Sequence, residues 1–176
     1  MKKAILSLFF LLFSLLGVAA VYGMQPSQYK ILILNSYHPG YSWANDIVSA
    51  IESTVLLENP GVDIRTEYMD TKRNSSADYF GYLKKVYQEK YQDQKFDLIF
   101  ACDDYAIKFL LDNGELLFPE TPIVFGGANL IDPSRVRENG WMTGVREKAD
   151  IMKTLDIAFS LQPETRELFV INDSSL

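Results

Sequence analysis

The sequence predicts an α/β fold, in which a doubly wound parallel sheet follows an N-terminal apolar helix that acts as a signal or anchor. From Lys30 onwards, short apolar runs of strand length alternate with longer segments whose apolar residues recur at helical spacing. This alternation is typical of right-handed βαβ units, whose parallel sheet is covered by helices on both faces. Before that point the chain is apolar, and no charged residue lies between Lys3 and Lys30.

The first half of the alternation predicts two strands and two helices. Residues 30–35 contain a continuous apolar run, as expected of a strand buried on both faces. Residues 62–68 alternate apolar and polar side chains, which favours a strand nearer the sheet edge. The helix between them is expected to end at residues 59–61, Asn-Pro-Gly, and Ser75 with Asp78 resembles a capping box that opens a second helix. The apolar positions of these helices are Ile47, Val48, Ile51 and Val55, and then Tyr79, Phe80, Leu83, Val86, Tyr87 and Tyr91.

The second half repeats the same rhythm with four more strands. They are expected at residues 97–102, 122–126, 142–146 and 166–172. The helix after the first of them begins at a cap provided by Asp103 or Asp104, and a last helix is terminated by Pro163. The apolar positions of these two helices are Ala106, Phe109 and Leu110, and then Ile151, Met152, Leu155, Ala158 and Phe159.

The strand at 166–172 has two interpretations. It pairs as an edge of the preceding sheet, or it begins a further βαβ series in a longer protein. We favour the second, because a helix and a strand followed by polar residues look like the start of another α/β unit.

Residues 1–23 form the leading segment. Lys2 and Lys3 precede a long apolar run that ends in small residues, which is the pattern of a secretory signal peptide. The run also approaches the length that crosses a bilayer, so an uncleaved membrane anchor is the alternative. Either way, we expect the rest of the chain to lie in the periplasm or at the extracytoplasmic face of the cell membrane.

Composition excludes several classes of protein. The 176 residues are 48% hydrophobic, which excludes a disordered chain, and the net charge of −6 comes without a cluster of cations, so no nucleic-acid partner is expected. The single cysteine, Cys102, cannot form an internal disulfide. One cysteine and one histidine fall short of the usual metal-ligand sets, and no glycine-rich nucleotide motif is present. We therefore expect no metal and no cofactor.

Candidate ligand-binding residues follow the predicted strands, because ligands of open parallel sheets bind outside the carboxyl ends of the strands. Residues 35–43 combine three aromatic rings, including Tyr37 and Trp43, with hydroxyl and amide groups. Pockets for small organic molecules have this composition, although the rings could also pack as a hydrophobic lid. The other loops expected at this edge contain residues 70–73, 103–105 and 126–129.

Two of these loops contain residues with both a structural and a functional interpretation. One of Asp103 and Asp104 is expected to cap the following helix, which leaves the other to accept a hydrogen bond from a ligand. Gly126-Gly127 permits a tight turn or a close backbone approach, and Asn129 is the better candidate for ligand contact.

A catalytic function is not expected. His38 and Cys102 would emerge at adjacent strand ends, but Cys102 is the last residue of a buried strand, where cysteine behaves as a small hydrophobe. The G-x-S-x-G motif of α/β hydrolases is absent, and the only histidine follows the first strand, so we expect no enzyme activity in this chain.

Four segments in one order and spacing resemble the substrate-binding-protein-like family related to ABC transporters. They are Lys30-Ile-Leu-Ile-Leu-Asn-Ser-Tyr-His38, Phe96-Asp-Leu-Ile-Phe-Ala-Cys-Asp-Asp-Tyr-Ala106, Pro122-Ile-Val-Phe-Gly-Gly-Ala-Asn129 and Thr143-Gly-Val145. The chain looks closest to the branch that forms the periplasmic sensor region of bacterial histidine kinases and diguanylate cyclases. The resemblance spans about residues 30–172.

The resemblance implies a fold of the type I periplasmic binding proteins, in which two α/β lobes joined by a hinge close on a small solute. Residues 30–146 would form the first lobe, and residues 147–176 the hinge crossing and the start of a truncated second lobe. Family ligand contacts map onto Ser36, Tyr37, Asp103, Asp104, Tyr105, Gly127 and Asn129, to which the composition of its loop adds Trp43. Transporter-type members usually carry small or hydroxylated residues where this chain has Asp103-Asp104-Tyr105, so the identity of the solute does not carry over.

The expected function is an extracytoplasmic solute-sensing module that signals by cleft closure, with a fused signalling domain as its partner. The alternative is a soluble substrate-binding protein that delivers its solute to an ABC permease. In both cases the ligand is a small organic solute, and the membrane is a partner only if residues 1–23 stay attached.

Overall fold

The computed structural model describes residues 29–148 and 150–171. These residues form a single five-stranded sheet with the strand order β2-β1-β3-β4-β5, and every neighbouring pair is parallel. The expected N-terminal apolar helix lies outside the described residues. No helix within the described ranges is long and apolar enough to cross a membrane.

The five strands follow the expected alternation closely. Their bounds are β1 Lys30–Asn35, β2 Asp63–Tyr68, β3 Leu98–Cys102, β4 Ile123–Ala128 and β5 Met142–Arg146. β2 is an edge strand, as its alternating pattern predicts, and its polar positions Asp63, Arg65 and Glu67 take part in ion pairs there. The expected neighbours β1 and β3 pair in the register Asn35 opposite Cys102, which places their carboxyl ends side by side.

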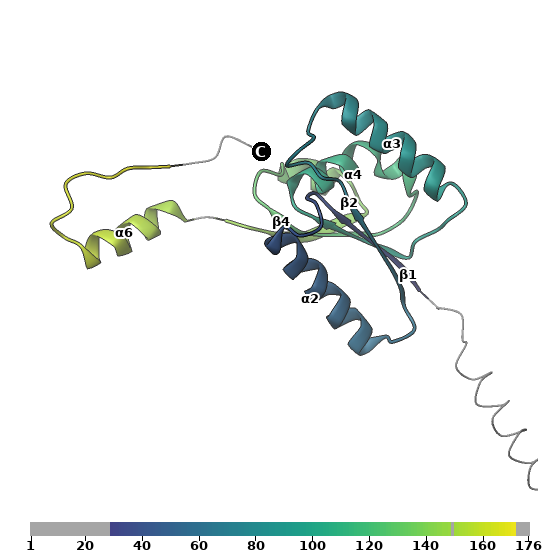
Figure 1. Cartoon of the computed structure of the whole chain (residues 1–176), viewed down its shortest axis with the longest axis horizontal. Helices are drawn as coiled ribbons and strands as arrows, with labels where there is room; N and C mark the ends of the chain where they lie inside the picture. The colour runs from purple at the N-terminus through teal and green to yellow at the C-terminus, as the bar shows by residue number, and fades with distance from the viewer. Residues whose placement is uncertain (1–28, 149, 172–176) are drawn as a thin grey trace, which may run out of the picture.

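Helices cover both faces of the sheet. α2 (Ser42–Glu58) lies against one face, whereas α3 (Ala77–Tyr91) and α4 (Asp104–Leu117) lie against the other, as Figure 1 shows. The short α5 (Pro133–Glu138) joins the α3 and α4 side through Val136, which packs against the same core. The α/β fold with an all-parallel sheet is therefore confirmed.

Two cores result from this layering. The larger lies under α3 and α4, and it buries alternate residues of the central strands, such as Leu32, Leu34 and Ile99, with the aromatic side chains Tyr87 and Phe96. The smaller lies under α2 and contains Ile33, Val48 and Cys102. Central strands buried on both faces explain why residues 31–34 form an unbroken apolar run.

The helix boundaries agree with the expected signals at most ends. α2 ends at Glu58 with Asn59 as its C-cap, and Asp103 caps α4. The predicted cap Ser75 is wrong by one residue, because the side chain of Ser76 accepts the Tyr79 N–H at 3.2 Å. α5 was not expected, although Asp132 as N-cap and Pro133 in the first helical turn are the ordinary signal for a helix start.

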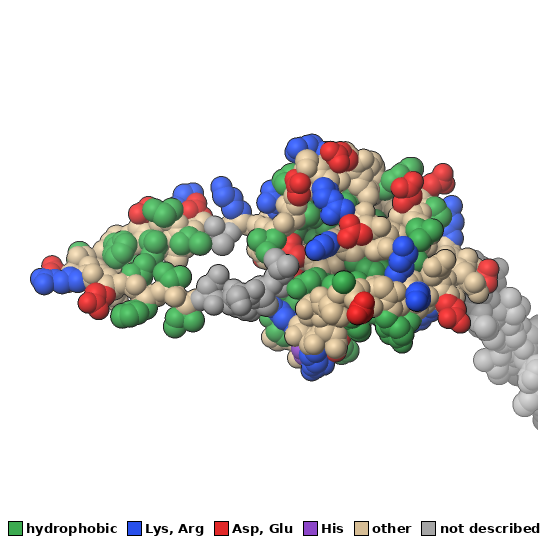
Figure 2. All heavy atoms as spheres, turned by 90° about the horizontal axis from the view of Figure 1, so that it is seen from above, with side chains coloured by type: hydrophobic (Ala, Val, Ile, Leu, Met, Phe, Trp, Pro, Cys, Tyr) green, Lys and Arg blue, Asp and Glu red, His purple; other side chains and the backbone are tan. Residues whose placement is uncertain are grey.

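The C-terminal part of the described chain lies away from the sheet. α6 (Ile151–Leu161) has no buried residue, and it ends before Pro163 as expected. The predicted strand at 166–172 is wrong for residues 166–171, which form no strand; residue 172 lies outside the described residues. Phe169, Val170 and Ile171 are 83%, 81% and 97% exposed. Figure 2 shows apolar side chains gathered on this projecting part of the molecule.

Candidate functional site

The candidate site lies at the carboxyl ends of β1 and β3, where the order of the strands reverses: β1 connects to β2 on one side of the sheet, and β3 connects to β4 on the other. α2 leaves β1 toward one face and α4 leaves β3 toward the other, so their loops diverge at this point. In doubly wound sheets this divergence forms the crevice in which ligands bind. The polar and aromatic residues of these loops are connected to one another by the contacts described below.

Ser36 holds three loops together at this edge. Its hydroxyl donates to the carbonyl oxygen of Cys102 at 2.8 Å and accepts the N–H of Ala106 at 2.8 Å. Its own carbonyl oxygen accepts the N–H and the hydroxyl of Thr71, at 2.9 and 2.7 Å. Ser36 is fully buried, so its hydroxyl has a structural role here, and its ligand contact stays a prediction.

Tyr37 lies at the centre of an aromatic cluster. Its ring centroid is 4.8 Å from that of Tyr41 and 5.9 Å from that of Trp43, both in edge-to-face arrangements. The ammonium of Lys72 lies 5.1 Å from the Tyr37 centroid, within the range of a cation–π contact. The three rings expected from the sequence therefore do come together, and Tyr41 remains exposed to solvent.

Asp103 is a buried acid in an unusual backbone conformation. Its φ is 74° and its ψ is 165°, a region used almost only by glycine, and its residue exposure is 5%. Its carboxylate accepts the Tyr37 hydroxyl and the Asp104 N–H, the latter at 2.7 Å. Burial raises the pKa of Asp103, whereas these two hydrogen bonds and the charge of Lys72 act in the opposite direction. Burial and the neighbouring Asp103 raise the pKa of Tyr37, which keeps its phenol protonated as the donor.

Asp104 connects the start of α4 to the loop after β4. Its Oδ1 accepts the N–H groups of Asn129 and Leu130 at 3.1 and 3.0 Å, and its Oδ2 lies 3.2 Å from the Asn129 nitrogen. Asn129 itself is exposed. The two acids that adjoin in sequence thus bind different loops, since Asp103 faces Tyr37 and Asp104 faces Asn129.

Gly127, near the carboxyl end of β4, is where the Trp43 ring from the first turn of α2 contacts this strand. Its φ is +75°, and a Cβ placed on it would lie 2.3 Å from the Trp43 Cη2 atom. The indole therefore packs directly on the Gly127 backbone, so the close approach considered for Gly126-Gly127 occurs at Gly127. Adjacent Gly126 has open space where its Cβ would be.

The Tyr105 ring packs on α3 and lies outside the aromatic cluster of Tyr37, Tyr41 and Trp43. Its ring stacks on Phe80 of α3 with centroids 5.7 Å apart and planes inclined by 22°. It lines two surface hollows, of about 240 and 380 Å³, that flank α4 and share Lys108. Helical geometry explains this, because Tyr105 follows Asp104 in the first turn of α4 and emerges on the α3 side.

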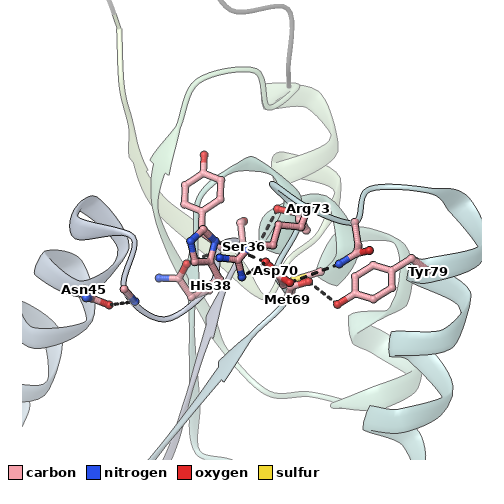
Figure 3. Close-up of polar contacts among 12 residues, drawn as sticks. Ser36, His38, Asn45, Met69, Asp70, Arg73 and Tyr79 are labelled. Carbon is pink, nitrogen blue, oxygen red and sulfur yellow. Dashed lines mark hydrogen bonds and ion pairs between the residues drawn. The ribbon is translucent and has the colours of Figure 1, made fainter.

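The loop after β2 contributes residues that were not singled out as site residues. Asp70 has a φ of +52°, and its carboxylate lies 3.5 Å from His38 Nδ1 and 3.3 Å from Arg73 Nη1. Figure 3 shows these side chains close to Ser36, above the ends of β1 and β2. The position of residues 70–73 after a strand was visible in the sequence. Which of their side chains turn toward the neighbouring loop depends on the positive φ of Asp70.

Cys102 packs as a small apolar side chain. It lies with Ile33 and Val48 in the smaller core, and burial raises the pKa of its thiol to about 12. A thiol with this pKa is not ionised near neutral pH, so it is a poor nucleophile.

Six of the eight predicted site residues are linked in one chain of contacts across the sheet edge. They are Tyr37, Trp43, Asp103, Asp104, Gly127 and Asn129. Ser36 precedes Tyr37 in the sequence, and its hydroxyl bonds to Cys102 and Ala106.

Comparisons with protein-family models, curated proteins and solved structures found no match to this chain.

Proposed function

We propose that this chain is the solute-binding part of an extracytoplasmic sensor of periplasmic-binding type. Residues 30–146 form the first lobe, and residues 147–176 form the hinge crossing and the start of a second lobe. The observation that carries the proposal is the continuous set of contacts from Tyr37 to Asn129 over the ends of β1 and β3. It brings aromatic rings and hydrogen-bonding groups to the place where doubly wound sheets bind ligands.

The exposed apolar surface of α6 and residues 168–171 supports a second lobe. An isolated helix of 11 residues is marginal in water, and contiguous exposed apolar side chains usually mark a surface that another element covers. A second α/β lobe would cover this surface and face the carboxyl edge of the sheet. Solute held between the lobes would favour the closed form, and this difference in affinity would supply the signal.

A soluble binding protein that delivers solute to an ABC permease is the alternative. The small residues that end the leading segment favour it, since they suit signal cleavage. Fractionation separates the two functions. A mature protein that starts near Val21 or Met24 in a periplasmic extract indicates the binding protein, whereas retention of residues 1–23 in the membrane indicates the sensor.

The test of the site is a binding experiment with the full-length natural protein. A thermal-shift screen of small organic solutes identifies a ligand, and calorimetry then compares the wild type with Tyr37→Ala. We expect Tyr37→Ala to weaken binding by about tenfold or more, because it removes the central ring of the cluster. Tyr82→Ala is the matched control, since Tyr82 is an exposed residue of α3. Equal affinity in Tyr37→Ala and the wild type, with circular dichroism unchanged, would contradict the proposed site.

A further inference from the structure

The Asp104 carboxylate accepts hydrogen bonds from two main-chain N–H groups. Asn129 and Leu130 are consecutive, and both donate to Asp104 Oδ1 across 25 and 26 residues of sequence. Successive N–H groups in a turn form a concavity that binds anions. In this protein the concavity after β4 is filled by a carboxylate from the first turn of α4.

This arrangement fixes the backbone of Asn129 and leaves its side chain accessible. The Asn129 Nδ2 atom lies 3.5 Å from the Gly127 carbonyl oxygen, at the outer limit of a hydrogen bond. Most of the capacity of this carboxamide is therefore available to solvent or to a bound molecule. Gly127, at the start of the same strip of backbone, carries the Trp43 ring.

We propose that Asp104 is a positioning residue: it holds the loop after β4 so that Asn129 and the Trp43 ring keep their places at the edge of the sheet. The importance of Asn129 and Trp43 for ligand binding rests on the proposed function, whereas the positioning of the loop by Asp104 does not. Asp104 then acts through Asn129 and does not touch the solute.

A general role of Asp104 at the start of α4 makes a different prediction. An acid in the first turn stabilises a helix through the helix dipole alone. In that case removing the carboxylate would affect α4, and it would leave the exchange of the Asn129 and Leu130 amides unchanged.

Amide hydrogen exchange in the full chain, followed by NMR, separates these roles. We expect Asp104→Ala to speed exchange at Asn129 and Leu130 by about tenfold or more, while amides of β1 and β3 exchange as in the wild type. Sodium formate should slow the exchange of these two amides again, because formate supplies the missing carboxylate, whereas sodium chloride at equal ionic strength should not. Asp104→Glu, which keeps a carboxylate, should keep both amides protected.

Asp112→Ala is the matched control for this experiment. Asp112 is an exposed acid of the same helix that pairs with Arg135 at 2.6 Å, so its loss removes an ion pair and leaves the loop after β4 untouched. Unchanged exchange at Asn129 and Leu130 in Asp104→Ala would overturn the proposal. If Asp104→Ala loses amide protection throughout the sheet, the same exchange measurement is made on Asp104→Asn. Loss of protection throughout the sheet in Asp104→Asn as well would overturn a local role of Asp104. Local loss with formate rescue, but no solute bound by the full-length protein, would keep the positioning role and reject the proposed function.

Discussion

At the scale of single residues, the contact between Trp43 and Gly127 depends on the absence of a Cβ. Gly127 combines a left-handed φ with an aromatic ring where a side chain would stand. Gly127→Ala should lower the free energy of unfolding by about 2–4 kcal/mol, because backbone strain and overpacking act together. Urea unfolding measures this difference. Gly126→Ala is the control, since open space surrounds its Cβ position, and it should change stability by less than about 0.5 kcal/mol. Equal stability of the two variants would show that Trp43 does not pack on Gly127.

The buried carboxylate of Asp103 is expected to lower the free energy of unfolding at neutral pH. Burial raises its pKa in the folded state above the unfolded value of about 3.9, so the folded state binds this proton more tightly. The contribution of the protonated Asp103 to the free energy of unfolding is fully present below the unfolded-state pKa. It is lost as the pH rises through the folded-state pKa. Asp103→Asn removes the charge and keeps a side chain of nearly the same shape, so the backbone strain at this position is the same in both proteins.

We therefore expect Asp103→Asn to be more stable than the wild type at pH 7, by an amount on the order of 1 kcal/mol. The difference between the two proteins should shrink as the pH is lowered toward 4. Denaturant unfolding at several pH values between 4 and 8 measures it. A variant that is less stable than the wild type by the same amount at every pH would contradict the burial argument.

Individual contacts were harder to predict from the sequence than positions at the carboxyl edge of the sheet. Ser36 and Asp104 were expected at this edge because they follow strands, and they do lie there. Their side-chain oxygen atoms, however, accept the main-chain N–H groups of Ala106 in α4 and of Asn129 after β4. Those partners are 70 and 25 residues away, so no local pattern could identify them. The Tyr105 ring packs on Phe80 and not with Tyr37, because one step along a helix turns a side chain by about 100°. Its contact with a ligand stays a prediction.

At the scale of secondary-structure elements, the strands were the most predictable feature. All five observed strands lie within two residues of their expected bounds, because the switch between apolar runs and helical spacing is abrupt. The expected strand at 166–172 failed because strand formation needs a neighbour. Apolar, β-forming side chains at 168–171 supply the propensity, but no described strand pairs with them.

α6 should be the least protected of the helices in residues 29–171 that the structure describes. It has 11 residues and buries none of them, whereas α4 buries six of its residues, five of them in the larger core. In hydrogen exchange followed by mass spectrometry, residues 151–171 of the 176-residue chain should exchange almost as fast as an unfolded peptide. Peptides from α4 should stay protected in the same experiment. Protection of 151–161 equal to that of α4 would mean that its apolar face is covered in solution.

At the scale of the whole molecule, the carboxyl edge of the sheet separates the two buried cores from the connected loops that form the candidate site. Below its carboxyl edge, helices on both faces bury the strands in two cores. Above that edge, the loops after β1, β2, β3 and β4 contact one another through side chains and main-chain groups. The loops that follow the strands meet at one edge because every strand of a parallel sheet ends on the same side.

We propose that the protein binds its solute at this edge of the sheet. The most direct measurement is to record amide NMR spectra of the 176-residue chain while small organic solutes are added, since this detects weak binding by a single lobe. For a solute that binds, we predict shifts in residues 36–43, 103–106 and 127–130 and in the Trp43 indole N–H. Shifts confined to the hollow beside Phe80, Lys108 and Asn113, with the signals of the carboxyl edge unchanged, would contradict solute binding at that edge.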